Sequence, residues 1–407
     1  MTGAAAAAAA VLALVLAGCP AQRTPTTAPG GDAIAINERD LRAGMKAELE
    51  DEILTSYERD EPPDVETAML DPRIGPARIG VGPGDVLIGP ELVRAPSRWP
   101  LDVDPRTRTE ARSKRLEVHL ARDGSAAWAF DEISWRIPMC GRTAAIPLRM
   151  TALFAREGDR WVQVFEHLSF GRIPAPSRDG RLRGAEIPSA VSSSDLVDEL
   201  SGVLAQGQFR ATRNASVVST GPEATIIGPD VNDEWHSVDV LASGLPALGL
   251  RAEDRRVGVV GRTPGTAMVA YWIGNFVATL PARPGIAAGK ARLRGSFVFE
   301  RRRLVKVEVE KRRRPRSLAD AEGRSCAEKP AECRWVLVQG HVSQSIDDGP
   351  DPSGERHDIV DLATLVFGTA LVSPKPVEVT CDDGSPPAPI KAPVAAPSRP
   401  PPAGGTR

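Results

Sequence analysis

The stretch WVQVFEHLS at residues 161–169 returns with changes as WVLVQGHVS at residues 335–343. Both stretches begin with Trp-Val, keep a valine at the fourth position and end on His-x-Ser. A second match lays GPGDVLIGPE, residues 82–91, on GPEATIIGPD, residues 221–230. Because the two matches follow one another in the same order, the sequence favours a tandem duplication.

Each copy is predicted to begin with a helix and to continue as antiparallel strands. In the first copy, apolar residues recur every four positions from Leu41 to Tyr57, and Asn37 can cap the helix. In the second copy, Ser194 or Asp195 can cap a similar helix. Alternating apolar residues follow, separated by Gly-containing turns that are typical of hairpins. The pattern predicts an α+β fold with helices on one face of a curved antiparallel sheet.

A helical start, a Gly-Pro segment, hairpins and a last strand ending Trp-x-x-x-x-x-His-x-Ser resemble the nuclear transport factor 2-like superfamily, especially its SnoaL-like branch. The resemblance covers residues 36–173 and 190–348. It implies two cone-shaped domains in tandem, each with a pocket between the helices and the bent sheet. The second copy departs from the pattern by a long insertion between its last two strands, at residues 311–334.

Alternation along the last strand of each copy selects the expected ligand pocket, because side chains on a strand point to opposite faces in turn. An aromatic ring, an amide, a histidine and a hydroxyl on one face would suit a small ligand with polar and apolar parts. The residues on this face are Trp161, Gln163, Phe165, His167 and Ser169 in the first copy, and Trp335, Leu337, Gln339, His341 and Ser343 in the second.

Catalysis is not assigned by these residues. Relatives that are enzymes abstract a proton in this pocket, so the resemblance makes His167 and His341 the candidates for a general base. The competing interpretation is structural, with each histidine bonded to its neighbours. Asp131 and Glu132 could approach the first pocket or lie at the strand end in solvent, and Ile273 and Gly274 stand at the corresponding place in the second copy. No carboxylate is therefore shared by the two copies.

The expected function is a small-ligand-binding or interaction module without a cofactor or a metal. The sequence has no P-loop, dinucleotide fingerprint, G-x-S-x-G elbow or H-E-x-x-H motif. Two alternatives remain open. One is a pocket enzyme of the isomerase, cyclase or dehydratase type, and the other is a purely structural envelope protein.

The N-terminus predicts export and a lipid anchor. The apolar run from Ala4 to Leu16 has the length of a secretory h-region and is too short to span a bilayer. LAGC at residues 16–19 resembles the bacterial lipobox, which implies acylation of Cys19. An ordinary signal peptide with an incidental cysteine is the alternative. Because Pro20 follows instead of Asp, the resemblance implies the outer membrane, on its periplasmic or surface face.

The chain is accordingly divided into seven segments. These are a signal peptide at 1–19, a tether at 20–35, a first SnoaL-like domain at 36–173, a linker at 174–189, a second SnoaL-like domain at 190–348, a C-terminal extension at 349–384 and a Pro-rich disordered tail at 385–407. The net charge of -2 over 407 residues gives no reason to expect nucleic acid as a partner. The expected partners are the membrane, through Cys19, a small ligand and an envelope protein.

The remaining cysteines suggest one disulfide. Cys326 and Cys333 flank the polar segment CAEKPAEC, and an exported protein permits a bridge between them. A zinc site formed with His341 is the alternative, although neither a C-x-x-C nor a paired-histidine motif is present. Spacing leaves open whether Cys140 and Cys381 pair or stay free.

Overall fold

The computed structural model describes residues 38–59, 74–82, 85–93, 99, 109–139, 142–169, 182, 187–205, 218–230, 232–243, 251–261, 265–282, 288–303, 326 and 333–344. Cys19, Cys140 and Cys381 lie outside the described residues, as do the segments predicted as signal, tether, extension and tail. None of the helices in the described part of the chain has the length and apolar content needed to span a bilayer.

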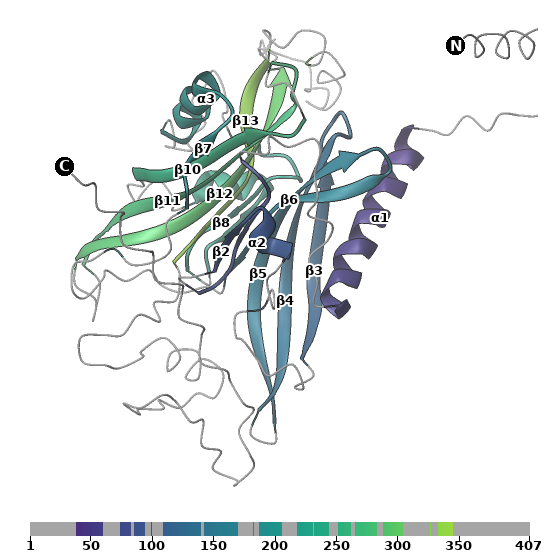
Figure 1. Ribbon diagram of the computed structural model, residues 1–407, viewed down its shortest axis with the longest axis vertical. Helices are drawn as coiled ribbons and strands as arrows, with labels where there is room; N and C mark the ends of the chain where they lie inside the picture. The colour runs from purple at the N-terminus through teal and green to yellow at the C-terminus, as the bar shows by residue number, and fades with distance from the viewer. Residues whose placement is uncertain are drawn as a thin grey trace, which may run out of the picture. The chain divides into compact units, whose positions relative to one another are not determined.

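The chain divides into two units, Met1–Leu41 and Arg42–Arg407. The described residues of the first unit are the opening turn of helix α1, which spans Glu38–Arg59 and begins directly after the predicted cap Asn37. Everything that follows concerns the second unit. It is an α+β structure with two sheets and few helices, as the sequence predicts (Figure 1).

The first sheet has six strands in the order β2-β1-β6-β5-β4-β3. Leu49, Ile53 and Tyr57 of α1 are buried in one cluster with residues of this sheet, because they recur on one side of the helix. Gly124 has a positive φ of 72° in the turn that closes the predicted β3–β4 hairpin. The elements are β1 Ala77–Ile79, β2 Val86–Ile88, α2 Pro90–Val93, β3 Glu110–Leu120, β4 Ala126–Met139, β5 Arg142–Glu157 and β6 Arg160–Ser169.

The second sheet has seven strands in the order β7-β10-β11-β12-β13-β8-β9. Helix α3, Ser194–Ala205, begins at one of the two predicted caps, and Leu196 and Leu200 are buried in the core of this sheet. The elements are β7 Ala190–Val191, β8 Thr225–Ile227, β9 Glu234–His236, the 3₁₀ helix η1 Ser237–Ala242, β10 Arg251–Val259, β11 Val269–Leu280, β12 Gly289–Arg303 and β13 Cys333–Ser343.

Six strands of the second sheet repeat the order of the first. In the first sheet, β6 pairs in parallel with β1, so that His167 lies opposite Ile79. In the second, β13 pairs in parallel with β8, so that His341 lies opposite Ile227. The two histidines that the sequence match equates therefore occupy the same place in the two sheets.

The other sequence match is out of register. After β1, the backbone N–H of Gly80 donates to the carbonyl of Asp85 at 2.6 Å, and after β8 the N–H of Gly228 donates to that of Asp233 at 2.8 Å. Gly228 thus corresponds in position to Gly80, whereas the sequence match paired it with Gly89. A short Gly-Pro pattern recurs by chance more easily than a hydrogen-bonded turn does, and this explains the error.

The two sheets pack against each other through the faces that point away from their helices. One buried cluster contains Ile79 and Phe165 of the first sheet together with Tyr271 and Val298 of the second. The rings of Phe165 and Tyr271 have centroids 6.2 Å apart. Burial of this apolar surface supplies the main driving force for the contact.

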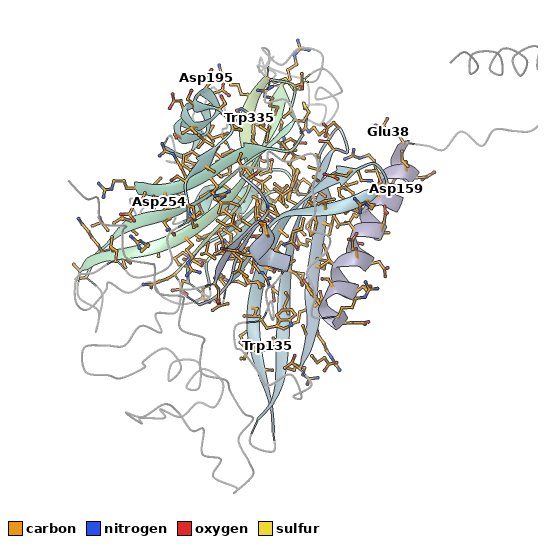
Figure 2. All side chains as sticks on the ribbon, viewed as in Figure 1. Glu38, Trp135, Asp159, Asp195, Asp254 and Trp335 are labelled. Carbon is orange, nitrogen blue, oxygen red and sulfur yellow. A yellow bond between two sulfur atoms is a disulfide. The ribbon has the colours of Figure 1, made fainter. Side chains whose placement is uncertain are left out.

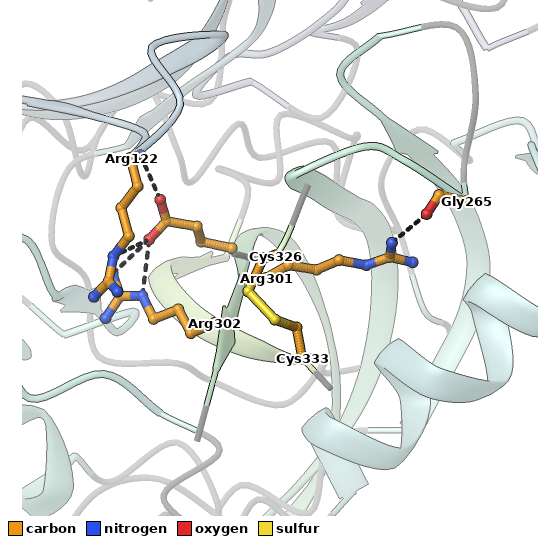
Figure 3. Close-up of a disulfide and its surroundings, with 7 residues drawn as sticks. Arg122, Gly265, Arg301, Arg302, Cys326 and Cys333 are labelled. Carbon is orange, nitrogen blue, oxygen red and sulfur yellow. Dashed lines mark hydrogen bonds and ion pairs between the residues drawn. A yellow bond between two sulfur atoms is a disulfide. The ribbon is translucent and has the colours of Figure 1, made fainter. Parts of the chain in front are cut away.

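Cys326 and Cys333 form a disulfide at the start of β13 (Figure 3). This confirms the predicted bridge. Within the described residues, no group of three or more His, Cys, Asp or Glu is arranged to hold a metal ion.

Candidate functional site

A β-bulge divides the last strand of the first sheet. The register shift falls between Gln163 and Phe165, so that Val164 is an extra residue. Trp161 belongs to the core beneath α1, whereas Phe165 belongs to the cluster between the sheets. The expectation that one face runs from Trp161 to Ser169 is therefore wrong, because an unpaired residue reverses the alternation of side chains.

The last strand of the second sheet has a bulge at the equivalent place. Its register shift falls between Leu337 and Gln339. Trp335 and Leu337 lie in the core beneath α3. Gln339 instead reaches across to the first sheet, where its amide nitrogen donates to the carbonyl of Ala129 at 2.8 Å. The predicted pocket residues are thus divided between two faces in both sheets.

His167 and His341 stack on each other between the sheets. Their ring centroids lie 3.8 Å apart with planes at 17°, and both side chains are completely buried. Nδ1 of His167 is hydrogen-bonded to Ser296 Oγ at 3.0 Å, and Nε2 to Ser343 Oγ at 2.8 Å. Burial, together with the nearby charge of Arg294, lowers the pKa of His167 well below its usual value, so that this ring is neutral.

His341 makes the reciprocal set of bonds with the first sheet. Nδ1 lies 3.0 Å from Thr151 Oγ1, and Nε2 lies 2.7 Å from Ser169 Oγ. Burial, followed by the neighbouring His167, lowers its pKa well below the usual value. A neutral imidazole offers one donor and one acceptor, and a hydroxyl can rotate to serve either. Since all four ring nitrogens are bonded inside the protein, neither ring has a nitrogen left for a substrate.

Two buried arginines continue the reciprocal pattern. Arg149 of β5 donates to the carbonyl of Gly228 at 2.9 Å, and Arg294 of β12 donates to that of Gly80 at 3.0 Å. Burial lowers the pKa of Arg149 to about 10, which leaves it charged at neutral pH. Each sheet thus uses the same set of side chains to contact the other sheet, which is the pattern of an isologous two-fold interface.

The core beneath α1 contains a buried carboxylate. Asp131 on β4 accepts hydrogen bonds from Tyr57 Oη and Ser113 Oγ, both at 2.9 Å, and from the backbone N–H of Arg115 at 3.3 Å. Burial raises the pKa of Asp131 to about 6, although the bonds from Ser113 and Tyr57 act in the opposite direction. This carboxyl can therefore exchange a proton near neutral pH.

Aromatic rings extend from Asp131 along the same core. The ring of Tyr57 lies 5.9 Å from that of Trp99, which stacks on Trp135 at 6.1 Å. Trp135 is labelled in Figure 2. Tyr57 Oη also lies 3.5 Å from Met150 Sδ. Nε1 of Trp135 is buried and has no hydrogen-bond partner among the described residues. We call this group the Asp131 cluster; it consists of Tyr57, Trp99, Ser113, Asp131, Trp135 and Met150.

Two further polar side chains in this core lack partners. Nε1 of Trp161 and both amide atoms of Gln163 are buried without a hydrogen bond to any described residue. The two residues lie on one face of β6, because no bulge separates them. Buried polar atoms without partners are uncommon in folded proteins and call for an explanation.

The second sheet has no counterpart of Asp131 in its described residues. Thr151 and Ser296 occupy equivalent positions, because each is hydrogen-bonded to the histidine of the other sheet. Each lies opposite one residue on the neighbouring strand, and the residues that come directly after those two are Asp131 and Gly274. A Cβ atom at Gly274 would lie 2.5 Å from the carbonyl oxygen of Asp254 and 3.3 Å from Nε1 of Trp272. The backbone carbonyl of Asp254 thus occupies the space, and a carboxylate is sterically excluded there.

The inward position of Asp131, although not its contacts, could have been found from the sequence. Ala127, Ala129, Ile133 and Trp135 alternate along β4 and all face the core beneath α1. Asp131 stands at the central inward position of this series, where a strand with a half-buried pattern should carry an apolar residue. An acidic residue in that position is the feature of the sequence that indicates a site on β4 and not on the last strand.

The SnoaL-like domain family matches residues 67–173 of this chain. Among solved structures, a proposed dehydratase of the nuclear transport factor 2-like family from Streptomyces avermitilis is 16% identical and covers 32% of this chain and 96% of its own, with a TM-score of 0.23. An uncharacterised cystatin-like-fold protein from Caulobacter vibrioides is 14% identical, covering 31% and 87%, with a TM-score of 0.23.

The association domain of CaMKII from C. elegans is 16% identical and covers 32% of this chain and 93% of its own, with a TM-score of 0.21. No curated protein matches the chain. The family match includes Trp99, Ser113, Asp131 and Trp135, so most of the Asp131 cluster lies inside it. The chain therefore contains a SnoaL-like domain at residues 67–173.

Proposed function

We propose that this protein binds a small ligand within its SnoaL-like domain, at the Asp131 cluster. A SnoaL-like domain fits a ligand-binding or pocket-enzyme module. The observation that carries the proposal is the pairing of a buried carboxyl, whose pKa is raised to about 6, with the buried and unpartnered Nε1 of Trp135. The ligand would have a flat apolar body and at least one hydrogen-bond acceptor.

The energetic cost of the Asp131 cluster supports this proposal. A buried N–H without a partner costs about 1–3 kcal/mol, and a buried carboxylate costs more. The second core has Gly274 at the corresponding place, where the carbonyl of Asp254 leaves no room for a side chain. Among the described residues, both cores contain a buried indole N–H without a partner, but only the first also contains a buried carboxyl, which is understandable if that carboxyl acts on something that binds.

We further propose that the second sheet is a second SnoaL-like domain that serves as an intramolecular partner. The recurrence of the strand order and the reciprocal contacts of His167, His341, Arg149 and Arg294 support a duplication whose halves pair as two subunits would. In this proposal the ligand-binding role belongs to the first domain. The second domain covers the apolar face of the first.

A lipid anchor in the bacterial envelope is also proposed. It is supported by the resemblance of residues 16–19 to a lipobox and by the short apolar run before them. Mass analysis of the N-terminal peptide should find an acylated Cys19, and Cys19→Ser should release the protein from the outer-membrane fraction. An unmodified cysteine in the full-length chain would refute this part of the proposal.

Native mass spectrometry of the whole protein, purified gently from its own membrane, tests the ligand proposal. We expect a bound small molecule in the wild type, and loss of that molecule in Asp131→Asn and Trp135→Phe. Trp272→Phe is the matched control, because it removes an equally buried indole N–H from the second core. Retention of the molecule in Trp135→Phe and Asp131→Asn would place the ligand elsewhere. An empty wild-type protein would favour the purely structural alternative.

A proton-transfer enzyme is the second candidate function. The raised pKa of Asp131 favours it, since a general base works best when its pKa is near the pH of the reaction. Asp131 then takes the role that the sequence interpretation gave to His167 and His341. Exchange of the α-protons of cyclic ketones in D2O, followed by NMR, should occur with the wild type and with Glu132→Gln but not with Asp131→Asn. Absence of exchange with the wild type would argue for binding alone.

A further inference from the structure

A hollow of 370 Å³ lies where α1 and the β3–β4 hairpin meet the second sheet. Its volume is at the lower end of the roughly 300–1,000 Å³ found for small-molecule pockets. It is separate from the Asp131 cluster, with which it shares no residue. Its lining consists of Arg42, Ala43, Lys46, Val118, His119, Leu120, Arg122, Trp128, Glu223, Glu300 and Arg302.

The two carboxylates of the hollow are Glu300 on β12 and Glu223 in the turn before β8, and arginines already hold them. The N–H of Arg122 donates to Glu300 Oε1 at 2.8 Å, and Arg302 Nη2 lies 2.7 Å from Glu300 Oε2 (Figure 3). Arg302 Nη1 lies 2.7 Å from Glu223 Oε1. Nε1 of Trp128 donates to the carbonyl of Glu223 at 3.0 Å. The hollow therefore exists only while the two halves are paired.

Positive charge remains after these pairs are made. The hollow has four cationic side chains against two carboxylates, a surplus of two charges in a chain whose net charge is -2. Arg42 is fixed at the rim, because it donates to the carbonyls of Ala121 and Arg122, each at 3.0 Å. Lys46 pairs with Glu50 at 3.5 Å one helical turn away, in an exposed contact that binds weakly.

His119 lines the hollow, but the Nε2 atom of its ring is covered by protein. Its Nε2 is buried and has no hydrogen-bond partner among the described residues, and the carboxylate oxygen of Glu117 lies 3.9 Å from it. Because Nε2 is covered in this structure, the ring must turn before its N–H can donate to an acceptor in the hollow. The surplus charge and the volume are therefore the observations that indicate the kind of ligand.

We infer that this hollow binds a small organic anion of two or more negative charges, such as a polycarboxylate or a phosphate ester. Lys46 and Arg42 supply the charge, and the salt bridges of Glu300 hold the wall in place. Because the walls come from both sheets, the bound anion also stabilises their pairing.

Titration calorimetry of the full-length protein with citrate, and separately with pyrophosphate, tests this inference. We expect saturable binding of at least one of the two anions. Lys46→Gln should weaken it about tenfold or more, as expected for loss of one charge-assisted hydrogen bond. Arg42→Lys keeps the positive charge but loses the planar set of N–H donors of the guanidinium, and it should also weaken binding. The matched control is Arg59→Gln, on the same helix outside the hollow, which should bind as the wild type does.

Three results would overturn the inference. The first is no saturable binding of either anion by the wild type. The second is an affinity in folded Lys46→Gln that equals that of Arg59→Gln; Lys46 is largely exposed, so its substitution should leave the fold intact. The third is Lys46-dependent binding to phosphatidylglycerol vesicles without binding of citrate or pyrophosphate. This result would mean that the positive charge of the hollow contacts a membrane surface and not a small anion.

Discussion

Asp131→Asn should change how the stability of this protein depends on pH. In the folded protein, burial raises the pKa of Asp131 from 3.8 to about 6. At pH values between 3.8 and about 6, Asp131 keeps its proton in the folded state and has lost it in the unfolded chain. The free energy of unfolding contributed by this group must then fall as the pH rises, and the loss is complete above about pH 6.

The size of this effect follows from the difference in pKa. A difference of about two units corresponds to about 3 kcal/mol at 25 °C. Asparagine is an uncharged isostere of the protonated acid. Its amide oxygen can accept from Ser113 Oγ and the N–H of Arg115, and its NH2 can donate to Tyr57 Oη. The variant should therefore keep the bonds and lose only the pH dependence.

The buried histidines act in the opposite direction, so the variant must be compared with the wild type at each pH. The lowered pKa values of His167 and His341 mean that their contribution is present above the unfolded pKa of about 6.5 and is lost as the pH falls. The wild type and Asp131→Asn both contain the two histidines, so their contribution to the free energy of unfolding cancels in the difference between the two proteins.

Urea unfolding at several values between pH 4 and pH 7 measures that difference. The stability of the wild type relative to Asp131→Asn should fall by about 2–3 kcal/mol over this range. Glu132→Gln, which changes the adjacent half-exposed carboxyl on the other face, is the control. The charge of Glu132 is the smallest of the causes acting on the pKa of Asp131, so this variant should follow the wild type closely. Parallel curves for the wild type and Asp131→Asn would refute the assignment of a raised pKa to this carboxyl.

Two further predictions concern contacts elsewhere in the fold. His341→Leu should lower the free energy of unfolding by about 2–6 kcal/mol at pH 7, because Thr151 and Ser169 each lose a buried partner worth about 1–3 kcal/mol; an unchanged urea midpoint would contradict the reciprocal bonding. Replacing Cys326 and Cys333 together with serine should cost about 2 kcal/mol, as expected for closing a short loop. Calorimetry of the wild type with and without a reductant should show the same loss, and equal melting temperatures would mean that the bridge does not form in solution.

Local patterns in the sequence were sufficient for several elements. The four-residue spacing of Leu49, Ile53 and Tyr57 predicted the buried side of α1, although Leu41 in the same series is 55% exposed. The Gly-containing turns expected from the sequence include that of the β3–β4 hairpin, where Gly124 has a positive φ. These features depend on residues a few positions apart, and periodicity therefore detects them.

Bulges are the reason why the pocket prediction failed. Val164 and Val338 are ordinary strand residues, and nothing in their local sequence marks them as unpaired. A bulge forms because of how a strand fits its neighbours, and one extra residue turns every later side chain to the other face. Phe165 and His167 consequently lie between the sheets and not beneath α1.

By itself, the sequence determined the α+β class, the hairpins, the disulfide and the equivalence of His167 with His341, because each of these rests on composition, short-range periodicity or direct repetition. Only the tertiary structure decided that the two histidines stack on each other and that Asp131 is buried beneath Tyr57. Both results depend on side chains that are distant in the chain and are brought together by sheet packing, and no local pattern encodes such a contact.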